Sequence, residues 1–110
     1  MLFRSDLARI GINLANYGVD IENGEHLMSE MVSRIVKTFM MTCGMYDASG
    51  EFAIKVGIPA KSGVGGGIMA SVPGRMGIGV YGPAPDKKGN SVAGVKVLEE
   101  LSNKLKLNIF

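Results

Sequence analysis

The sequence predicts an α+β fold in which a short antiparallel sheet is packed by helices. In the first half of the chain, apolar residues recur at helical spacing. In the second half, short apolar runs are separated by glycine and proline, and much of the glycine lies between Gly57 and Gly94. The order of helices, hairpin and helix is typical of an α+β domain. With 110 residues, 46% of them hydrophobic and 20% charged, the chain corresponds to one folded domain.

A first helix is predicted to follow Ser5-Asp6, where Ser5 would cap the helix and Asp6 would lie in its first turn. Gly18 is placed to end this helix in a left-handed conformation, and Asn23-Gly24 predicts a tight turn further along. The apolar and small residues that share one helical face are Leu7, Ile10, Gly11, Leu14 and Ala15.

A second helix is predicted to open at Ser29 and to stop at Gly44. It carries the clearest helical period of the chain, and we expect this stripe to be buried, with Arg34 and Lys37 lying off it. The residues of the stripe are Val32, Ile35, Val36, Phe39, Met40 and Cys43. Cys43 is therefore expected to be a small core residue. As a single cysteine it excludes an internal disulfide and a zinc site built from cysteines, and it fits a reducing, cytoplasmic compartment.

Residues 51–56 are predicted to form a short helix, because Glu51, Ala53 and Lys55 favour helix over strand. From Ile58 the pattern becomes extended and runs through Lys61 into the glycine-rich segment 63–67.

Two strands, at residues 68–72 and 76–81, are predicted to form a hairpin around Pro73-Gly74. Asn90 or Ser91 is placed to cap a last helix. The single domain thus divides into a helical region at 5–44, a sheet region at 58–82 and a C-terminal helix at 91–105.

Charge and composition exclude several classes of function. A net charge of +2, with only 4 Phe, 3 Tyr and no Trp, does not fit a nucleic-acid-binding surface. No uninterrupted apolar run reaches the roughly 20 residues that a membrane span needs. His26 stands alone without a second ligand at metal-binding spacing, so we expect an ordinary surface or turn histidine.

Two glycine-containing strings resemble nucleotide-binding motifs only superficially. Gly77-Ile-Gly79-Val-Tyr-Gly82 has the spacing of a dinucleotide fingerprint, but it lies within a predicted strand and is followed by Pro83 rather than by a helix. Lys61-Ser62-Gly63 has the reverse order of a phosphate-binding loop. Neither string predicts a nucleotide site.

Lys61-Ser62-Gly63 is instead similar to the lysine-serine/threonine-glycine element of penicillin-binding proteins and serine β-lactamases, which lies on an edge strand beside the active site. Longer segments around it, at 44–53, 56–68, 72–74 and 89–94, resemble the C-terminal signatures of the glutaminase family. The resemblance covers essentially the whole chain.

This resemblance implies a serine β-lactamase-like fold and an amidohydrolase that converts L-glutamine to glutamate and ammonia without metal or organic cofactor. It also implies a homo-oligomer, a dimer or tetramer, in the complete enzyme. Tyr46 matches the family's active-site tyrosine, which relays a proton and positions the substrate. Val64 matches the residue whose backbone N–H binds substrate in the oxyanion hole. Lys61 and Ser62 are given only a supporting place in the strand wall.

The nucleophile of the family lies in a Ser-x-x-Lys element, in which the lysine serves as base. No serine of this chain has a lysine three residues later. We therefore expect this chain to be the C-terminal portion of a glutaminase, with the Ser-x-x-Lys element upstream.

Two other classes of function remain open. A β-lactamase or peptidase relative of the same fold would also use the Lys61-Ser62-Gly63 strand, although the glutaminase-like run from Tyr46 to Gly50 argues against it. A non-catalytic interaction module is favoured by the absent nucleophile and by the 8 methionines. An in-frame Ser-x-x-Lys in the DNA upstream of Met1 would discriminate a part of an enzyme from a stand-alone product.

Overall fold

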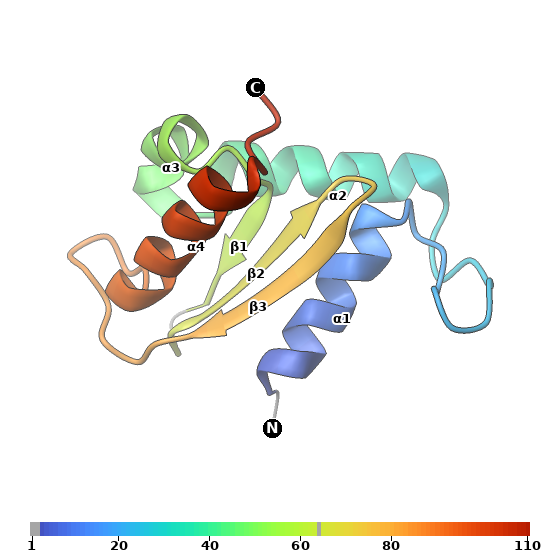
Figure 1. The fold of residues 1–110 in the computed structure, drawn as a ribbon, viewed down its shortest axis with the longest axis horizontal. Helices are drawn as coiled ribbons and strands as arrows, with labels where there is room; N and C mark the ends of the chain where they lie inside the picture. Colours follow the sequence, from blue (N-terminus) through green and yellow to red (C-terminus); the bar gives the residue numbers. More distant parts are fainter. Residues whose placement is uncertain (1–2, 64) are drawn as a thin grey trace.

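The computed structural model describes residues 3–63 and 65–110, in which helices pack on a three-stranded antiparallel sheet of order β1-β2-β3 (Figure 1). This arrangement confirms the predicted fold class. The elements of the described residues are α1 (Arg4–Ala15), α2 (Glu30–Cys43), the 3₁₀ turn η1 (Tyr46–Ala48), α3 (Ser49–Lys55), β1 (Ala60–Ser62), β2 (Gly67–Val72), β3 (Met76–Tyr81) and α4 (Val92–Leu105).

The hairpin of β2 and β3 forms as the sequence predicts. Its register pairs Val72 with Met76, and the Arg75 amide closes the turn by donating to the Val72 carbonyl (2.9 Å). Gly74 has φ of +72°, a conformation that glycine adopts without steric cost after the proline at the first turn position.

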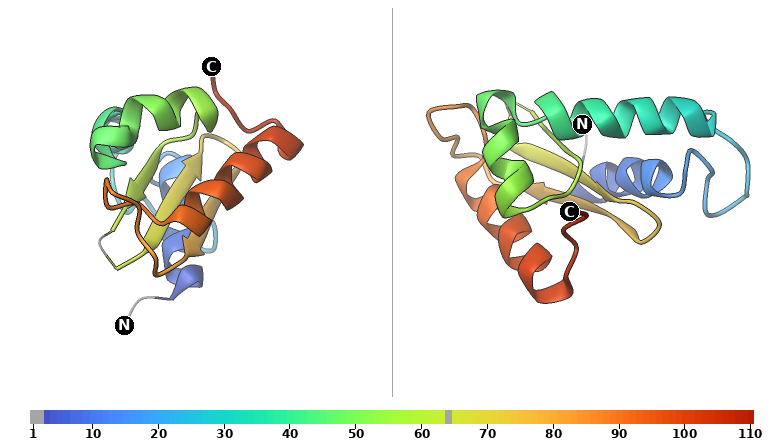
Figure 2. Two further views of the ribbon diagram at one scale, coloured as in Figure 1. Left: turned by 90° about the vertical axis from the view of Figure 1, so that its left-hand side faces the viewer. Right: turned by 90° about the horizontal axis from the view of Figure 1, so that it is seen from above.

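One face of the sheet forms the hydrophobic core with α3 and α4. Ile68, Ala70 and Val72 alternate along β2 and are buried on this face. Viewed from above, the sheet lies between α4 on one side and α1 and α2 on the other (Figure 2). The remaining buried members of the core are Met45, Phe52, Val56, Ile58, Ala60, Leu98 and Leu107.

On the opposite face of the hairpin, β3 presents Gly77 and Gly79, and α1 lies directly on them. A Cβ atom on Gly77 would lie 2.0 Å from the Ile12 nitrogen, and one on Gly79 would lie 2.2 Å from the Arg4 carbonyl oxygen. The helix contributes Gly11, whose Cβ would lie 2.4 Å from the Ala70 carbonyl oxygen. Two glycines of the false dinucleotide fingerprint, Gly77 and Gly79, therefore form a packing seam with Gly11, where the helix and strand backbones touch.

The start and the buried face of α1 differ from the prediction. Phe3, not Ser5, is the N-cap, and the Asp6 carboxylate accepts a hydrogen bond from the Phe3 amide (2.8 Å). Because the glycine seam turns Gly11 and Leu14 toward the sheet and α2, Ile10 is exposed rather than buried.

The buried face of α2 was predicted wrongly, although its N-cap Ser29 is confirmed. The buried residues are Ser33, Lys37 and Met40, whereas most of the apolar stripe is exposed and Cys43 is exposed with it. The physical reason is polar contact with α1 and its C-terminal turn. The Ser33 hydroxyl donates to the Leu14 carbonyl (2.9 Å), and the Lys37 ammonium lies 4.5 Å from the centroid of the Tyr17 ring.

Burial lowers the pKa of Lys37 below its ordinary value, and the nearby positive charge of Arg34 lowers it further, while Glu30 acts in the opposite direction. The ring of Tyr17 lies beneath the ammonium and compensates part of the lost hydration. Lys37, which the sequence places off the buried stripe, is thus buried by its contact with Tyr17, in the turn that follows α1.

The two remaining helices follow the prediction. The segment at 51–56 lies mostly within α3, and α4 begins at Val92 after Ser91, whose side chain accepts a hydrogen bond from the Gly94 amide (3.0 Å). Within the part of the chain that the structure describes, no helix is both long and apolar enough to cross a membrane.

We expect Gly77→Ala to lower the free energy of unfolding by about 2–3 kcal/mol, because the added methyl group forces the α1 and β3 backbones apart. Gly50→Ala is the matched control, since Gly50 lies in α3 and no atom lies within 4 Å of a Cβ built there. That variant should be neutral or more stable by up to about 1 kcal/mol. Urea unfolding followed by circular dichroism measures both changes, and equal stabilities of the two variants would contradict the seam.

Candidate functional site

Three segments that are distant in the sequence meet beside β1: residues 44–49, the strand itself, and the loop 86–91. The Ser62 amide donates to the Gly44 carbonyl (2.9 Å), which attaches the end of α2 to the outer side of β1. The Asn90 side chain is buried and donates from Nδ2 to the Met45 carbonyl (2.9 Å). These bonds hold the segment that precedes Tyr46 from both sides.

Gly44 has a second role besides ending α2. A Cβ atom at this position would lie 1.9 Å from the Ala60 carbonyl oxygen and 2.4 Å from the Met40 carbonyl oxygen. Only glycine therefore allows the chain to pass this close to β1. The sequence analysis recognised the helix stop but not the approach to the strand.

Tyr46 has left-handed backbone geometry, with φ of +55°. This conformation costs a non-glycine residue on the order of 1–2 kcal/mol and persists only where the surroundings hold it. Ser49 provides that hold, because its hydroxyl accepts from the Met45 amide (3.0 Å) and donates to the Tyr46 carbonyl (2.8 Å). Backbone strain of this kind is concentrated at functional sites.

The Tyr46 side chain is 39% exposed, so it is not a buried packing residue. The Lys61 ammonium lies 4.7 Å from the centroid of its ring and also donates to the Ser62 carbonyl. The loop residue Gly89, with φ of +92°, lies against the same ring: a Cβ built on it would be 3.5 Å from Tyr46 Cε2. The candidate site residue Tyr46 and the strand residue Lys61 are thus brought together.

Lys61 and Ser62 point to opposite faces of the sheet, as neighbours on a strand must. Lys61 is exposed, whereas Ser62 is buried with a hydroxyl that has no hydrogen-bond partner among the described residues. The two side chains therefore do not form a nucleophile–base pair.

Val64, the second expected site residue, lies outside the described residues. Its neighbours form a tight turn, in which the Gly63 amide donates to the Gly67 carbonyl (2.9 Å) and the Gly66 amide donates to the Gly63 carbonyl (3.0 Å). Gly66 has φ of +96°, and a Cβ there would lie 2.4 Å from the Gly82 carbonyl oxygen. The turn therefore requires glycine at this position.

An open groove lies over β1 and β2 on the side of the sheet that α1 and α2 cover. Its two parts have volumes of about 430 Å³ next to α1 and about 380 Å³ next to α2, and both parts are lined by Lys61 and Met69. The α1 part includes Ser62, Gly63 and Gly65, and the α2 part includes Phe39 and Cys43 of the exposed stripe. The strand and the glycine turn thus border an accessible, mostly apolar space.

Cys43 lies at this groove and is not the buried residue that the sequence predicts. Its thiol donates to the Phe39 carbonyl (3.2 Å) and lies 3.7 Å from the Thr42 hydroxyl. Neither partner is a base that would activate a thiol. Cys43 is therefore accessible but is not arranged as a nucleophile.

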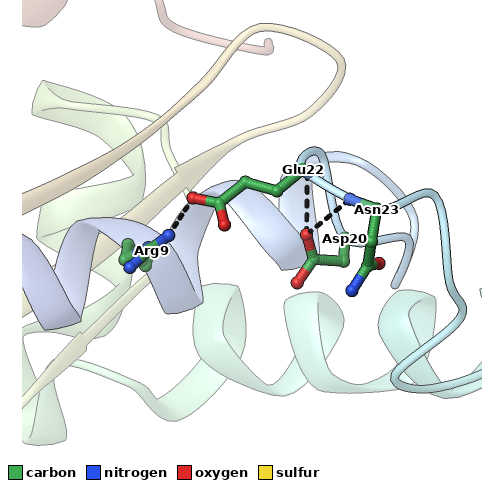
Figure 3. A network of polar contacts seen from close by, with 4 residues as sticks. All are labelled: Arg9, Asp20, Glu22 and Asn23. Atoms are coloured by element: carbon green, nitrogen blue, oxygen red, sulfur yellow. Dashed lines mark hydrogen bonds and ion pairs between the residues drawn. The ribbon is translucent and has the colours of Figure 1, made fainter.

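A separate polar network organises the loop between α1 and α2 (Figure 3). The Asp20 carboxylate accepts from the amides of Glu22 (2.7 Å) and Asn23 (3.3 Å), while Glu22 pairs with Arg9. His26 is exposed in the same loop, with Nδ1 3.4 Å from the Met28 carbonyl oxygen. As the sequence predicts, His26 is an ordinary turn histidine.

The described site holds a phenol, an ammonium group and a glycine turn beside one strand. The family resemblance predicted Tyr46 as a candidate site residue, but sequence reasoning missed the contacts of Ser49, Gly89 and Asn90 around it. Ser49 and Asn90 lie within the very segments that carry the resemblance, yet their contacts with Met45 depend on the fold.

The structure closely matches solved glutaminases. A Bacillus glutaminase crystallised in 4.3 M NaCl superposes with a TM-score of 0.97 and 45% identity, over 99% of this chain and 38% of that chain. A Bacillus subtilis glutaminase, solved as a covalent complex with 5-oxo-L-norleucine, gives a TM-score of 0.94 and 46% identity over 96% of this chain and 39% of that chain. These neighbours also confirm the serine β-lactamase-like fold that the resemblance implies.

Sequence comparison gives the same family. A glutaminase from Clostridioides difficile (strain 630) is 99% identical over 105 residues, which are 96% of this chain and 34% of that protein. The chain thus spans about a third of the length of the curated relatives that it matches. The sequence model of the glutaminase family matches residues 2–110, and the chain therefore belongs to the glutaminase family.

Proposed function

We propose that this chain is the C-terminal portion of a glutaminase that hydrolyses the side-chain amide of L-glutamine to L-glutamate and ammonia. The main support for this proposal is structural. Almost the whole chain matches, at a TM-score of 0.94, a glutaminase that forms a covalent complex with 5-oxo-L-norleucine. That compound carries a ketone carbon at the position of the glutamine amide carbon. The complex forms from 6-diazo-5-oxo-L-norleucine, in which a nucleophile replaces dinitrogen on the carbon next to that ketone. It therefore supports a protein nucleophile close to the position of the amide carbon.

In the proposed reaction, the serine of an upstream Ser-x-x-Lys attacks the amide carbon, and the lysine of that element accepts the serine proton. Collapse of the tetrahedral intermediate breaks the carbon–nitrogen bond, and the nitrogen leaves as ammonia after it receives a proton. Water then hydrolyses the acyl-enzyme to glutamate. Tyr46 contributes the hydroxyl that relays this proton and positions the amide. Its exposure and its contact with Lys61, which lines the open groove, support that role.

Val64 is proposed to supply a backbone N–H to the developing oxyanion. Support comes from the described neighbours: the Ser62 amide is directed to the outer side of β1, toward Gly44, and the Gly63 amide is directed to β2. Both amides are therefore already bonded within the fold, and Val64 is assigned the role because it matches the residue that serves in the oxyanion hole of the family.

A non-catalytic interaction module is the second candidate. The exposed apolar stripe of α2 favours it, because a contiguous apolar surface of this kind is typical of an interface. The same stripe supports the proposal that the complete protein is a homo-oligomer. A cytoplasmic location is likewise proposed, from the single cysteine of the chain.

Tyr46→Phe in the full-length enzyme should lower turnover by about 10²-fold or more, because the ring still packs against Lys61 and Gly89 while the proton-relaying hydroxyl is lost. Ammonia release measures the effect, and an unchanged melting temperature shows that the fold is retained. A rate equal to that of the unmodified enzyme would return Tyr46 to a packing role.

Val64→Pro in the full-length enzyme should lower turnover by about 10²–10³-fold, because proline has no N–H to donate to the oxyanion. Val64→Ala is the control, since it keeps the amide and removes only side-chain volume. Turnover is compared for variants with matched circular dichroism spectra. Equal activities of the two folded variants would show that this amide lies outside the oxyanion hole.

The 110 residues alone should release no ammonia from glutamine, because no serine among them has a lysine three residues later. Ser62 does not replace that serine, since its side chain and that of Lys61 lie on opposite faces. Ammonia release by the purified chain tests this, with Ser62→Ala as control. Robust turnover that this substitution abolishes would place the nucleophile within the chain.

A further inference from the structure

Lys61 is the charged side chain of β1, and its ammonium has two described contacts. It lies 4.7 Å from the centroid of the Tyr46 ring, and it donates to the Ser62 carbonyl. The second contact attaches the ammonium to the strand backbone, while the first directs its charge at the ring. A cation over an aromatic face is attracted by the negative face of the ring, and the attraction depends on how the ring is oriented.

The other supports of Tyr46 act on the main chain. Ser49 bonds the backbone on either side of the tyrosine, at the Met45 amide and the Tyr46 carbonyl. Asn90 binds the Met45 carbonyl. These bonds fix where the side chain begins but leave its two torsions free. Lys61 and the backbone at Gly89, by contrast, lie against the ring itself.

We propose that Lys61 is a positioning residue for Tyr46: its ammonium, held by the Ser62 carbonyl, fixes the tilt of the ring and so directs the phenol hydroxyl at the reacting amide. This inference rests on the proposed glutaminase function. Lys61 need not touch the substrate in this role, because it acts through the tyrosine. Its position on β1 also fixes Tyr46 relative to the glycine turn that follows the same strand.

The test uses a full-length glutaminase that carries this segment, with Lys61→Met and Lys61→Arg made in the unmodified and the Tyr46→Phe backgrounds. Ammonia release over a range of glutamine concentrations gives kcat and KM. We expect Lys61→Met to lower kcat by about fivefold to thirtyfold with KM changed less than about threefold, the range between an exposed and a desolvated cation–π contact. Lys61→Arg keeps a cation that stacks on aromatic rings and should recover kcat to within about threefold.

The Tyr46→Phe background tests whether Lys61 affects kcat through the Tyr46 hydroxyl. Where the hydroxyl is already absent, Lys61→Met should lower the remaining kcat by less than about twofold, since a correctly tilted ring no longer matters. Lys37→Met is the matched control: it removes the same kind of contact, 4.5 Å from the Tyr17 ring, at a position outside the site. That variant should leave kcat within about twofold, and thermal unfolding of every variant reports on the fold.

Several results would overturn the proposal. An unchanged kcat in Lys61→Met, or an effect confined to KM, would show that Lys61 does not orient the hydroxyl. A loss of the same size in both backgrounds would show that it acts independently of Tyr46. An unmodified enzyme that releases no ammonia would contradict the proposed function, and the role of Lys61 would fall with it. An active enzyme that is insensitive at Lys61 would contradict the positioning role alone.

Discussion

The structure depends on backbones that approach one another more closely than side chains allow. Where α1 packs on the hairpin, Gly77 and Gly79 of β3 and Gly11 of α1 have no side chains, so the two backbones can touch. α1 packs closely on the sheet, and its Leu14 carbonyl accepts a hydrogen bond from the Ser33 hydroxyl. That hydrogen bond orients α2. The orientation of α2 in turn determines which of its faces is exposed. It also determines where the chain that follows α2 meets β1.

The candidate site is the end point of this sequence of contacts. Gly44 brings the chain against β1, Ser49 and Asn90 hold Met45 and the strained Tyr46, and Lys61 meets the ring from the strand. The supports come from the three segments that meet beside β1, so the position of the phenol depends on how these segments pack. The strain at Tyr46 is tolerated because the bonds around it leave the backbone few alternatives.

The sequence predicted well what depends on local chemistry. The Pro73-Gly74 hairpin, the caps at Ser29 and Ser91 and the helix at 51–56 all rest on residues within a few positions of one another. The burial of α2 could not be predicted in the same way. Its period shows which residues share a face, but it does not show what covers that face. A polar face carrying Ser33 and Lys37 is buried because α1 offers a carbonyl and a tyrosine ring.

The site itself was predicted only through family resemblance. Nothing in the local sequence indicates that Tyr46 has positive φ or that Asn90 binds a carbonyl 45 positions earlier in the chain. Gly44 was assigned as a helix stop, and its second role depends on the distance to Ala60, which only the tertiary fold defines. The glycines of the hairpin likewise matched a nucleotide motif by spacing, and their true partner is a helix at the other end of the chain.

The hydrogen bond from the Ser62 amide to the Gly44 carbonyl also affects which molecules could bind along β1. An exposed edge strand can bind an extended peptide, which pairs with its outward amides as an added strand. On β1 that outward amide is already occupied, and Gly44 lies against the edge with no side chain that could swing aside. A polypeptide aligned along β1 would have to displace the end of α2. The edge is thus closed to strand addition, and a compact molecule that reaches the site end-on avoids this obstacle.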